Sequence, residues 1–280
     1  MSAGADSGEA PSYLACILEL VGRSVAQLVR PPSHSRRAEA ARRLARHSLL
    51  ITAIFGVLII LLMYVLDARE IGLMPPRQTP SLWPVRILTD FGKDAYVLWA
   101  LAGLLILVSF LSPLLHGKSR SRWLSFGLRV QFLFFAVLTP VLAGAVVKWI
   151  VGRGRPFVGG EANPFNFEPF VGTEAYASFP SSHAITAFAL AFAVTALWPR
   201  ARAAMIAYAL LIAGSRLVLL AHHPSDVVAG ALMGVLGAMS VRYWFAARRL
   251  GFTIQRNGHI APPRKVFGRR KRVAHKPTAP

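Results

Sequence analysis

Eight polar residues in three short segments of the chain have types and spacings suited to phosphate chemistry. They are Lys148, Arg155, Ser181, Ser182, His183, Arg216, His222 and Asp226. An arginine presents a planar pair of donors to phosphate oxygens, and a lysine adds a compact positive charge. A histidine held by a carboxylate can act as a nucleophile, and a second histidine can protonate a leaving oxygen. This inventory predicts metal-free phosphoryl transfer through a phosphohistidine.

The same residues argue against a metal cofactor. Magnesium favours oxygen ligands, and Asp226 is the one carboxylate that these segments supply. Zinc bound by His183, His222 and His223 is the alternative, but the three nearby cations would oppose a bound dication. We therefore expect neither a metal nor another cofactor.

The elements that position these residues are expected to be membrane helices. The 280 residues are 54% hydrophobic, with a mean hydropathy of +0.48, more apolar than a soluble domain of this size. Crossing a bilayer takes about 20 mostly apolar residues. Six stretches qualify: 49–66, 97–115, 130–147, 181–199, 203–221 and 224–247. Pro140 is tolerable inside the third, and Gly230, Gly234 and Gly237 in the sixth would allow close helix packing. The sequence predicts an all-α fold with six transmembrane helices.

The distribution of basic residues predicts the orientation. Lys and Arg concentrate before the first stretch, after the sixth, and in the loops at 116–123 and 199–202. An even number of spans places all four segments on one side, which the positive-inside rule assigns to the cytoplasm. The connections at 67–96, 148–180 and 222–225 then face outward. We expect a bacterial inner-membrane protein with both termini cytoplasmic and the eight residues facing the periplasm.

The net charge of +20 raises the question of an anionic partner. The tail "PPRKVFGRRKRVAHKP" could bind nucleic acid, but beside a membrane span its charge is better explained by topology and anionic lipids. We expect anionic lipids at the cytoplasmic face and no nucleic acid. Residues 11–30 predict an amphipathic helix on the inner surface, with a core-packed helix as the alternative. The single cysteine, Cys16, excludes an internal disulfide.

The three segments are similar to the signature of the type-2 phosphatidic acid phosphatase superfamily. Its first block, Lys, six residues, then Arg-Pro, is met at 148–156. Its second, Pro-Ser-Gly-His, is nearly met at 180–183, and its third, Ser-Arg, five residues, His, three residues, Asp, is met at 215–226. The departure is Ser182, where the family usually has glycine. Glycine permits close backbone approach to an anion, whereas a serine can still cap a helix, so we expect activity to survive.

The resemblance implies a role for each matching position. His222 would be the nucleophile, Asp226 its orienting carboxylate, and His183 the acid that protonates the leaving group and then activates water. The implied phosphate cradle consists of Lys148, Arg155, Ser181, Ser182 and Arg216. The family spacing selects His222 and leaves His223 as a bystander at the membrane interface. We expect Arg153, between the family positions, to face lipid headgroups.

The outward position of these residues predicts a phosphorylated lipid as substrate. The resemblance supports undecaprenyl diphosphate, the lipid A phosphates, phosphatidylglycerophosphate and phosphatidic acid. A lipid phosphotransferase that uses the same phosphohistidine is one alternative, and a non-enzymatic anion-binding or transport protein is another. The aromatic loops at 157–179 and 81–87 could form a lid and an interfacial anchor.

The expected organisation has three parts. A cytoplasmic segment with the amphipathic helix occupies 1–46, a six-helix membrane phosphatase domain 47–247, and a basic cytoplasmic tail 248–280.

Overall fold

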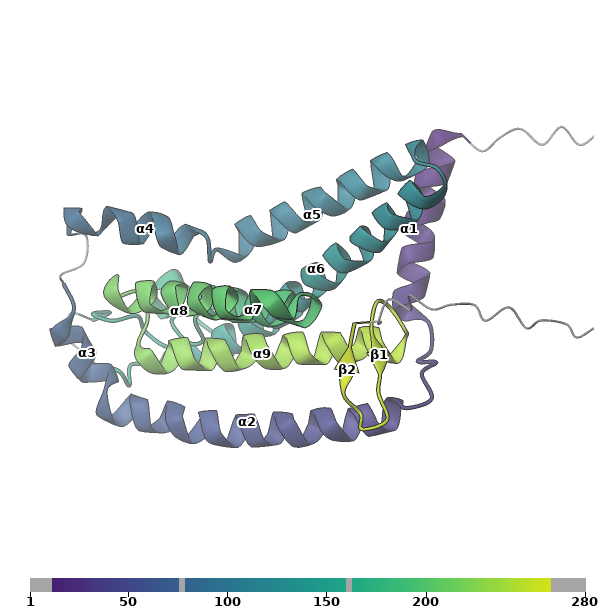
Figure 1. Cartoon of the computed structure of the whole chain (residues 1–280). Helices are drawn as coiled ribbons and strands as arrows, with labels where there is room; N and C mark the ends of the chain where they lie inside the picture. Colours follow the sequence, from purple (N-terminus) through teal and green to yellow (C-terminus); the bar gives the residue numbers. More distant parts are fainter. Residues whose placement is uncertain (1–11, 76–78, 160–162, 263–280) are drawn as a thin grey trace, which may run out of the picture.

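The computed structural model describes residues 12–75, 79–159 and 163–262, which form an almost entirely helical bundle (Figure 1). Within these residues, five helical segments are long and apolar enough to cross a membrane. They are α2 (Arg37–Val65), the segment Pro80–Leu114, α6 (Gly117–Val151), the segment Pro199–Val218 and α9 (Pro224–Ala247). The chain is thus a multi-pass membrane protein.

Two of the five segments are composite. Pro80–Leu114 contains η1 (Pro80–Leu82), α4 (Trp83–Asp90), α5 (Asp94–Leu111) and η2 (Ser112–Leu114), and it bends between α4 and α5 (Figure 1). Pro199–Val218 joins η4 (Pro199–Ala201) to α8 (Arg202–Val218).

The expected fourth span forms a shorter helix than the others. This helix, α7 (Ser182–Leu197), is apolar but has 16 residues. At 1.5 Å per residue it is about 24 Å long, against a hydrocarbon core of about 30 Å. It ends at Trp198, directly before Pro199 starts η4. α7 therefore does not qualify as a sixth full-length span.

Small residues bring α7 to the centre of the bundle, where it packs against α6, α8 and α9. A Cβ atom at Gly230 would lie 2.5 Å from the carbonyl oxygen of Ser181, and one at Gly234 would lie 2.4 Å from that of Ile185. Neither position admits a side chain, so the close packing expected of these glycines is confirmed. The contact holds the first turn of α7 against the second and third turns of α9.

The candidate residues gather at one end of the bundle, on the left in Figure 1. There α6 and α8 end and α7 and α9 begin. The connection after α2 is partly helical: α3 (Asp67–Leu73) follows α2 directly, and η1 and α4 come next. Across the site, η3 (Glu174–Tyr176) is a short turn in the loop between α6 and α7.

The opposite end carries two further elements. Helix α1 (Tyr13–Val29) crosses the direction of α2 (Figure 1) and buries none of its residues, as an interfacial helix would. A hairpin of β1 (Thr253–Ile254) and β2 (Ile260–Ala261) packs on the end of α9. The first part of the expected tail is thus folded, because Phe252, Ile254 and Ile260 are buried. The remainder of the tail lies outside the described residues.

Candidate active site

The site is built where α6 ends. Gly152 adopts a left-handed conformation with φ of 55° and terminates the helix. A Cβ atom there would lie 1.8 Å from the carbonyl oxygen of Glu168, so the turn requires glycine. Lys148 lies on the last turn of α6, whereas Arg155 lies beyond the helix, so the two do not share one helix face.

The loop between α6 and α7 is held by main-chain hydrogen bonds. The N–H of Glu168 donates to the carbonyl of Gly152 at 2.7 Å, and the N–H of Ser178 donates to the carbonyl of Arg153 at 2.9 Å. These bonds place the end of the loop, at Ser178, beside the start of α9.

His222 has its ring orientation fixed by this loop. Its Nδ1 lies 2.8 Å from the carbonyl oxygen of Ser178. A carbonyl oxygen only accepts hydrogen bonds, so Nδ1 carries the proton and Nε2 keeps a free lone pair. The residue is 2% exposed. The carboxylate of Asp226 is farther away, with Oδ2 at 3.9 Å from Nδ1.

Positive charge surrounds His222. Burial is the largest cause that holds the pKa of His222 well below its ordinary value, and the charges of Arg216, Lys148 and Arg155 act in the same direction, as does His183. The structure therefore brings the three expected cations and both expected histidines together. With its pKa lowered, His222 is a neutral imidazole at neutral pH, within the influence of this cationic cluster.

Each of the three cations is held by a separate partner. Lys148 Nζ donates to the carbonyl oxygens of Ala177 and Pro180 at 2.6 and 2.9 Å. Arg216 Nη1 donates to Thr89 Oγ1 of α4 at 3.0 Å. Arg155 donates from Nη2 to the Glu174 carboxylate at 2.9 Å. Thr89 and Glu174 are site residues that the sequence did not indicate.

The start of α7 supplies two polar groups to the site. Ser181 is the N-cap residue, and its N–H donates to the carbonyl of Asp226 at 3.0 Å. The Ser181 side chain makes no capping hydrogen bond. Its hydroxyl and His183 Nε2 are buried, and neither has a hydrogen-bond partner among the described residues. Ser182 is the first residue of α7.

Arg153 is the largest departure from expectation. Instead of facing headgroups it is fully buried. Its Nη1 donates to Asp226 Oδ1 at 2.6 Å, its Nη2 donates to Asp67 Oδ2 at 2.8 Å, and the Pro164 carbonyl accepts from Nε at 3.0 Å. Two buried carboxylates require such a cation, because a buried charge without a partner is strongly destabilising.

The other oxygen of Asp226 completes the network. Asp226 Oδ2 accepts from Ser178 Oγ at 2.6 Å and from the N–H of His223 at 2.9 Å. Ser178 therefore contacts Asp226 through its side chain and His222 through its carbonyl. His223 is fully buried, so it is not exposed at an interface as expected. Asp67 could have been suspected, since it directly follows an apolar span at the same membrane face.

The described residues contain no group of three His, Cys, Asp or Glu residues with a geometry that could hold a metal ion.

Comparison with known proteins assigns the chain to a family. The family model of the PAP2 superfamily matches residues 129–250, which include all eight candidate residues. A lipid A 1-phosphatase of Rhizobium johnstonii is 33% identical over 177 residues, covering 61% of this chain and 71% of that protein. The chain belongs to the PAP2 superfamily.

Two further relatives are similar to somewhat shorter stretches of this chain. A lipid A 1-phosphatase of Rhizobium etli is 34% identical over 153 residues, which cover 53% of this chain and 64% of that protein. The bacitracin transport permease protein BcrC of Bacillus licheniformis is 27% identical over 175 residues, with coverages of 58% and 79%. No solved structure matches the chain.

Proposed function

We propose that this chain, a membrane lipid phosphatase, removes the 1-phosphate of lipid A through a phosphohistidine intermediate. The observation that carries the mechanism is the environment of His222, where Nδ1 lies against the Ser178 carbonyl, which leaves Nε2 its lone pair, and the charges of three cations act on the ring. The substrate is proposed from the two relatives that are lipid A 1-phosphatases.

In the first step, Nε2 of His222 attacks the phosphorus atom of the substrate. A P–N bond forms, the bond to the leaving oxygen breaks, and His183 donates a proton to that oxygen. Lys148, Arg155 and Arg216 neutralise the phosphoryl oxygens. The hydroxyl of Ser181, which is buried without a partner in the described part of the chain, donates to one of them.

In the second step, His183 removes a proton from water, and the resulting nucleophile attacks the same phosphorus atom. The P–N bond breaks and inorganic phosphate leaves. His222 returns to the tautomer that the Ser178 carbonyl accepts from. No step in this sequence uses a metal.

Asp226 acts indirectly in this scheme. Its nearest oxygen lies 3.9 Å from His222 Nδ1, but it accepts a hydrogen bond from Ser178 at 2.6 Å. We assign it to holding Ser178 in place and to stabilising the positive charge that His222 gains on phosphorylation.

The test measures phosphate release by the purified protein in detergent, with EDTA present throughout. The substrates are lipid A, undecaprenyl diphosphate, phosphatidylglycerophosphate and phosphatidic acid, and the variants are His222→Ala and His116→Ala. His116 is exposed at the start of α6, at the other end of the bundle. We expect release that is fastest with lipid A, survives EDTA and is lost in His222→Ala alone.

Two outcomes would contradict parts of the proposal. Activity that EDTA abolishes would overturn metal-free chemistry, and faster release from another lipid would replace the proposed substrate. Trapping of acid-labile, base-stable label on the wild-type protein, but not on His222→Ala, tests the intermediate directly. Transfer of phosphate to a lipid acceptor in place of water would favour a phosphotransferase.

A further inference from the structure

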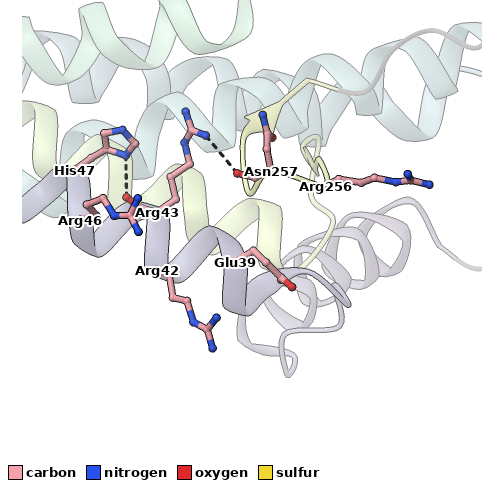
Figure 2. Close-up of a pocket in the computed structure, with 7 residues that line it drawn as sticks. All are labelled: Glu39, Arg42, Arg43, Arg46, His47, Arg256 and Asn257. Carbon is pink, nitrogen blue, oxygen red and sulfur yellow. Dashed lines mark hydrogen bonds between the residues drawn. The ribbon is translucent and has the colours of Figure 1, made fainter.

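A basic pocket lies at the end of the bundle opposite the candidate active site. Its volume is about 430 Å³, and Figure 2 shows the seven residues that line it. They are Glu39, Arg42, Arg43, Arg46, His47, Arg256 and Asn257. Arg43 and the start of α3 at Asp67 are 24 positions apart, about 36 Å along a helix. The pocket is therefore separate from the site at His222.

The pocket has walls from two elements that are distant in sequence. The α2 helix supplies one wall, and the turn between β1 and β2 supplies the other (Figure 2). A Cβ atom at Gly258 would lie 2.8 Å from the carbonyl oxygen of Glu39, so the turn closes directly on α2. Arg43 Nη1 also donates to the carbonyl of Asn257 at 3.3 Å. The hairpin turn, which carries Arg256, is thus held against α2.

Positive charge dominates the lining. Its lining residues include four arginines and one glutamate. With the residues that the structure describes, Arg42, Arg46 and Arg256 form no ion pair. His259 lies directly before β2. Its pKa is lowered first by burial and then by the charges of Arg242 and Arg43. Such a concentration of unneutralised positive charge attracts anionic ligands.

The geometry favours phosphate as that anion. Arginine side chains match phosphate oxygens with planar, paired donors, and four arginines line this pocket. The pocket also lies next to the apolar part of α2, because Arg46 precedes the exposed Leu49 by three residues, about 4.5 Å of helix. At this level relative to the membrane, the nearest source of a phosphate group is the headgroup of a membrane lipid.

We propose that the α2–hairpin pocket binds a phosphate group, presented at this membrane surface by the headgroup of an anionic phospholipid. Free phosphate or polyphosphate offers the same chemistry from solution, so the experiment separates the two sources. We assign this pocket a binding role alone.

The test compares two triple variants of the full-length protein in detergent. One is Arg43→Gln with Arg46→Gln and Arg256→Gln. Its matched control removes three charges from the same end of the bundle, by Lys118→Gln with Arg120→Gln and Arg122→Gln at the exposed start of α6. The probes are phosphatidylglycerol, phosphatidylcholine and sodium tripolyphosphate. Phosphatidylglycerol is a phosphodiester, so a phosphomonoesterase does not consume it.

Binding is followed by native mass spectrometry and by the shift in the thermal unfolding midpoint on titration. We expect phosphatidylglycerol to bind the wild type and the control at least tenfold more tightly than it binds the pocket variant. Phosphatidylcholine, which is zwitterionic, should bind all three weakly. Lipid bound at the candidate active site is common to all three proteins and cancels in the comparison.

Each other outcome has a defined meaning. Tighter binding of tripolyphosphate than of phosphatidylglycerol, lost in the pocket variant, would keep the phosphate site and assign it to a soluble ligand. Equal losses in the two triple variants would overturn the proposal, because the attraction would then be diffuse. If the triple variant does not fold, the single variant Arg256→Glu on the exposed hairpin turn provides the same comparison. An unchanged affinity for phosphatidylglycerol in Arg256→Glu would overturn the proposed phosphate site.

Discussion

Arg153 and Asp67 form an ion pair of 2.8 Å in which neither side chain is exposed. Asp67 directly follows the first spanning helix, and Arg153 opens the loop after α6. The same guanidinium contacts Asp226 at 2.6 Å. One side chain therefore joins the end of α2 to the first turn of α9, beside His222.

Replacing Arg153 with lysine should damage both stability and catalysis. A lysine cannot serve the two carboxylates and the Pro164 carbonyl together, and breaking a buried pair costs about 3–5 kcal/mol. We expect a lower midpoint of thermal unfolding and a fall in kcat of at least tenfold. Arg202→Lys, at an exposed position, is the control. Wild-type values for both quantities in Arg153→Lys would show that the network does not support the site.

Glu70 should make the stability of the fold depend on pH. Its carboxylate is buried, and burial, with smaller effects of Asp67 and Asp226, raises its pKa to about 8. The unfolded chain ionises Glu70 near its ordinary pKa, so the folded state binds more protons in the interval between the two values. The stabilisation is present below the ordinary pKa and is lost as the pH rises to about 8.

The variant Glu70→Gln tests this. We expect the unfolding midpoint of the wild type to fall between pH 5 and pH 8, and that of Glu70→Gln to fall less. Glu19→Gln, an exposed substitution on α1, should behave as the wild type. Parallel curves for wild type and Glu70→Gln would contradict the assignment.

The fall of kcat/KM at low pH, the acidic limb of the pH profile, should depend on the positive charge around His222. A positive neighbour lowers the pKa of this histidine, so removing one by Arg155→Gln should raise it. The neutral nucleophile would then be lost at a higher pH, and the acidic limb of kcat/KM should move upward. The substrate's own titration is common to both proteins. Arg202→Gln should leave the limb in place, and the absence of a shift in Arg155→Gln would count against the assigned cluster.

Ser182 should be compatible with activity. It starts α7, where its N–H is available as a glycine N–H would be. We expect Ser182→Gly to change kcat by less than tenfold, measured as phosphate release. An increase of several orders of magnitude would show that the native site is impaired.

The loop between α6 and α7 should matter for lipids in particular. Phe165 and Phe170 are 43% and 57% exposed, and each touches an aromatic residue at the end of a spanning helix, Tyr64 or Trp149. Replacing both with serine should slow lipid turnover several-fold and leave hydrolysis of p-nitrophenyl phosphate unchanged. A parallel fall on both substrates would indicate distortion of the site and argue against a lid.

The apolar runs in the sequence predicted most of the helices. The positions of the candidate residues at the ends of these runs predicted that they gather at one end of the bundle. Periodic apolar runs and glycine spacing report on packing along a helix, and α2, α6 and α9 follow them. The length of α7 was overestimated, because an apolar run continues through Trp198 although the helix stops there. The roles of Arg153 and Asp67 depend on where a loop folds back, and the position of Asp67 directly after an apolar span is the one local sign of it.

The contact between His222 and the Ser178 carbonyl has a consequence for genetics. The group that selects the imidazole tautomer belongs to the main chain, so every amino acid at position 178 would supply it. A substitution at position 178 would remove the hydroxyl bond to Asp226, but it would never remove the carbonyl itself. Only a change in backbone chemistry, such as an ester linkage, or in the path of the loop would reveal it.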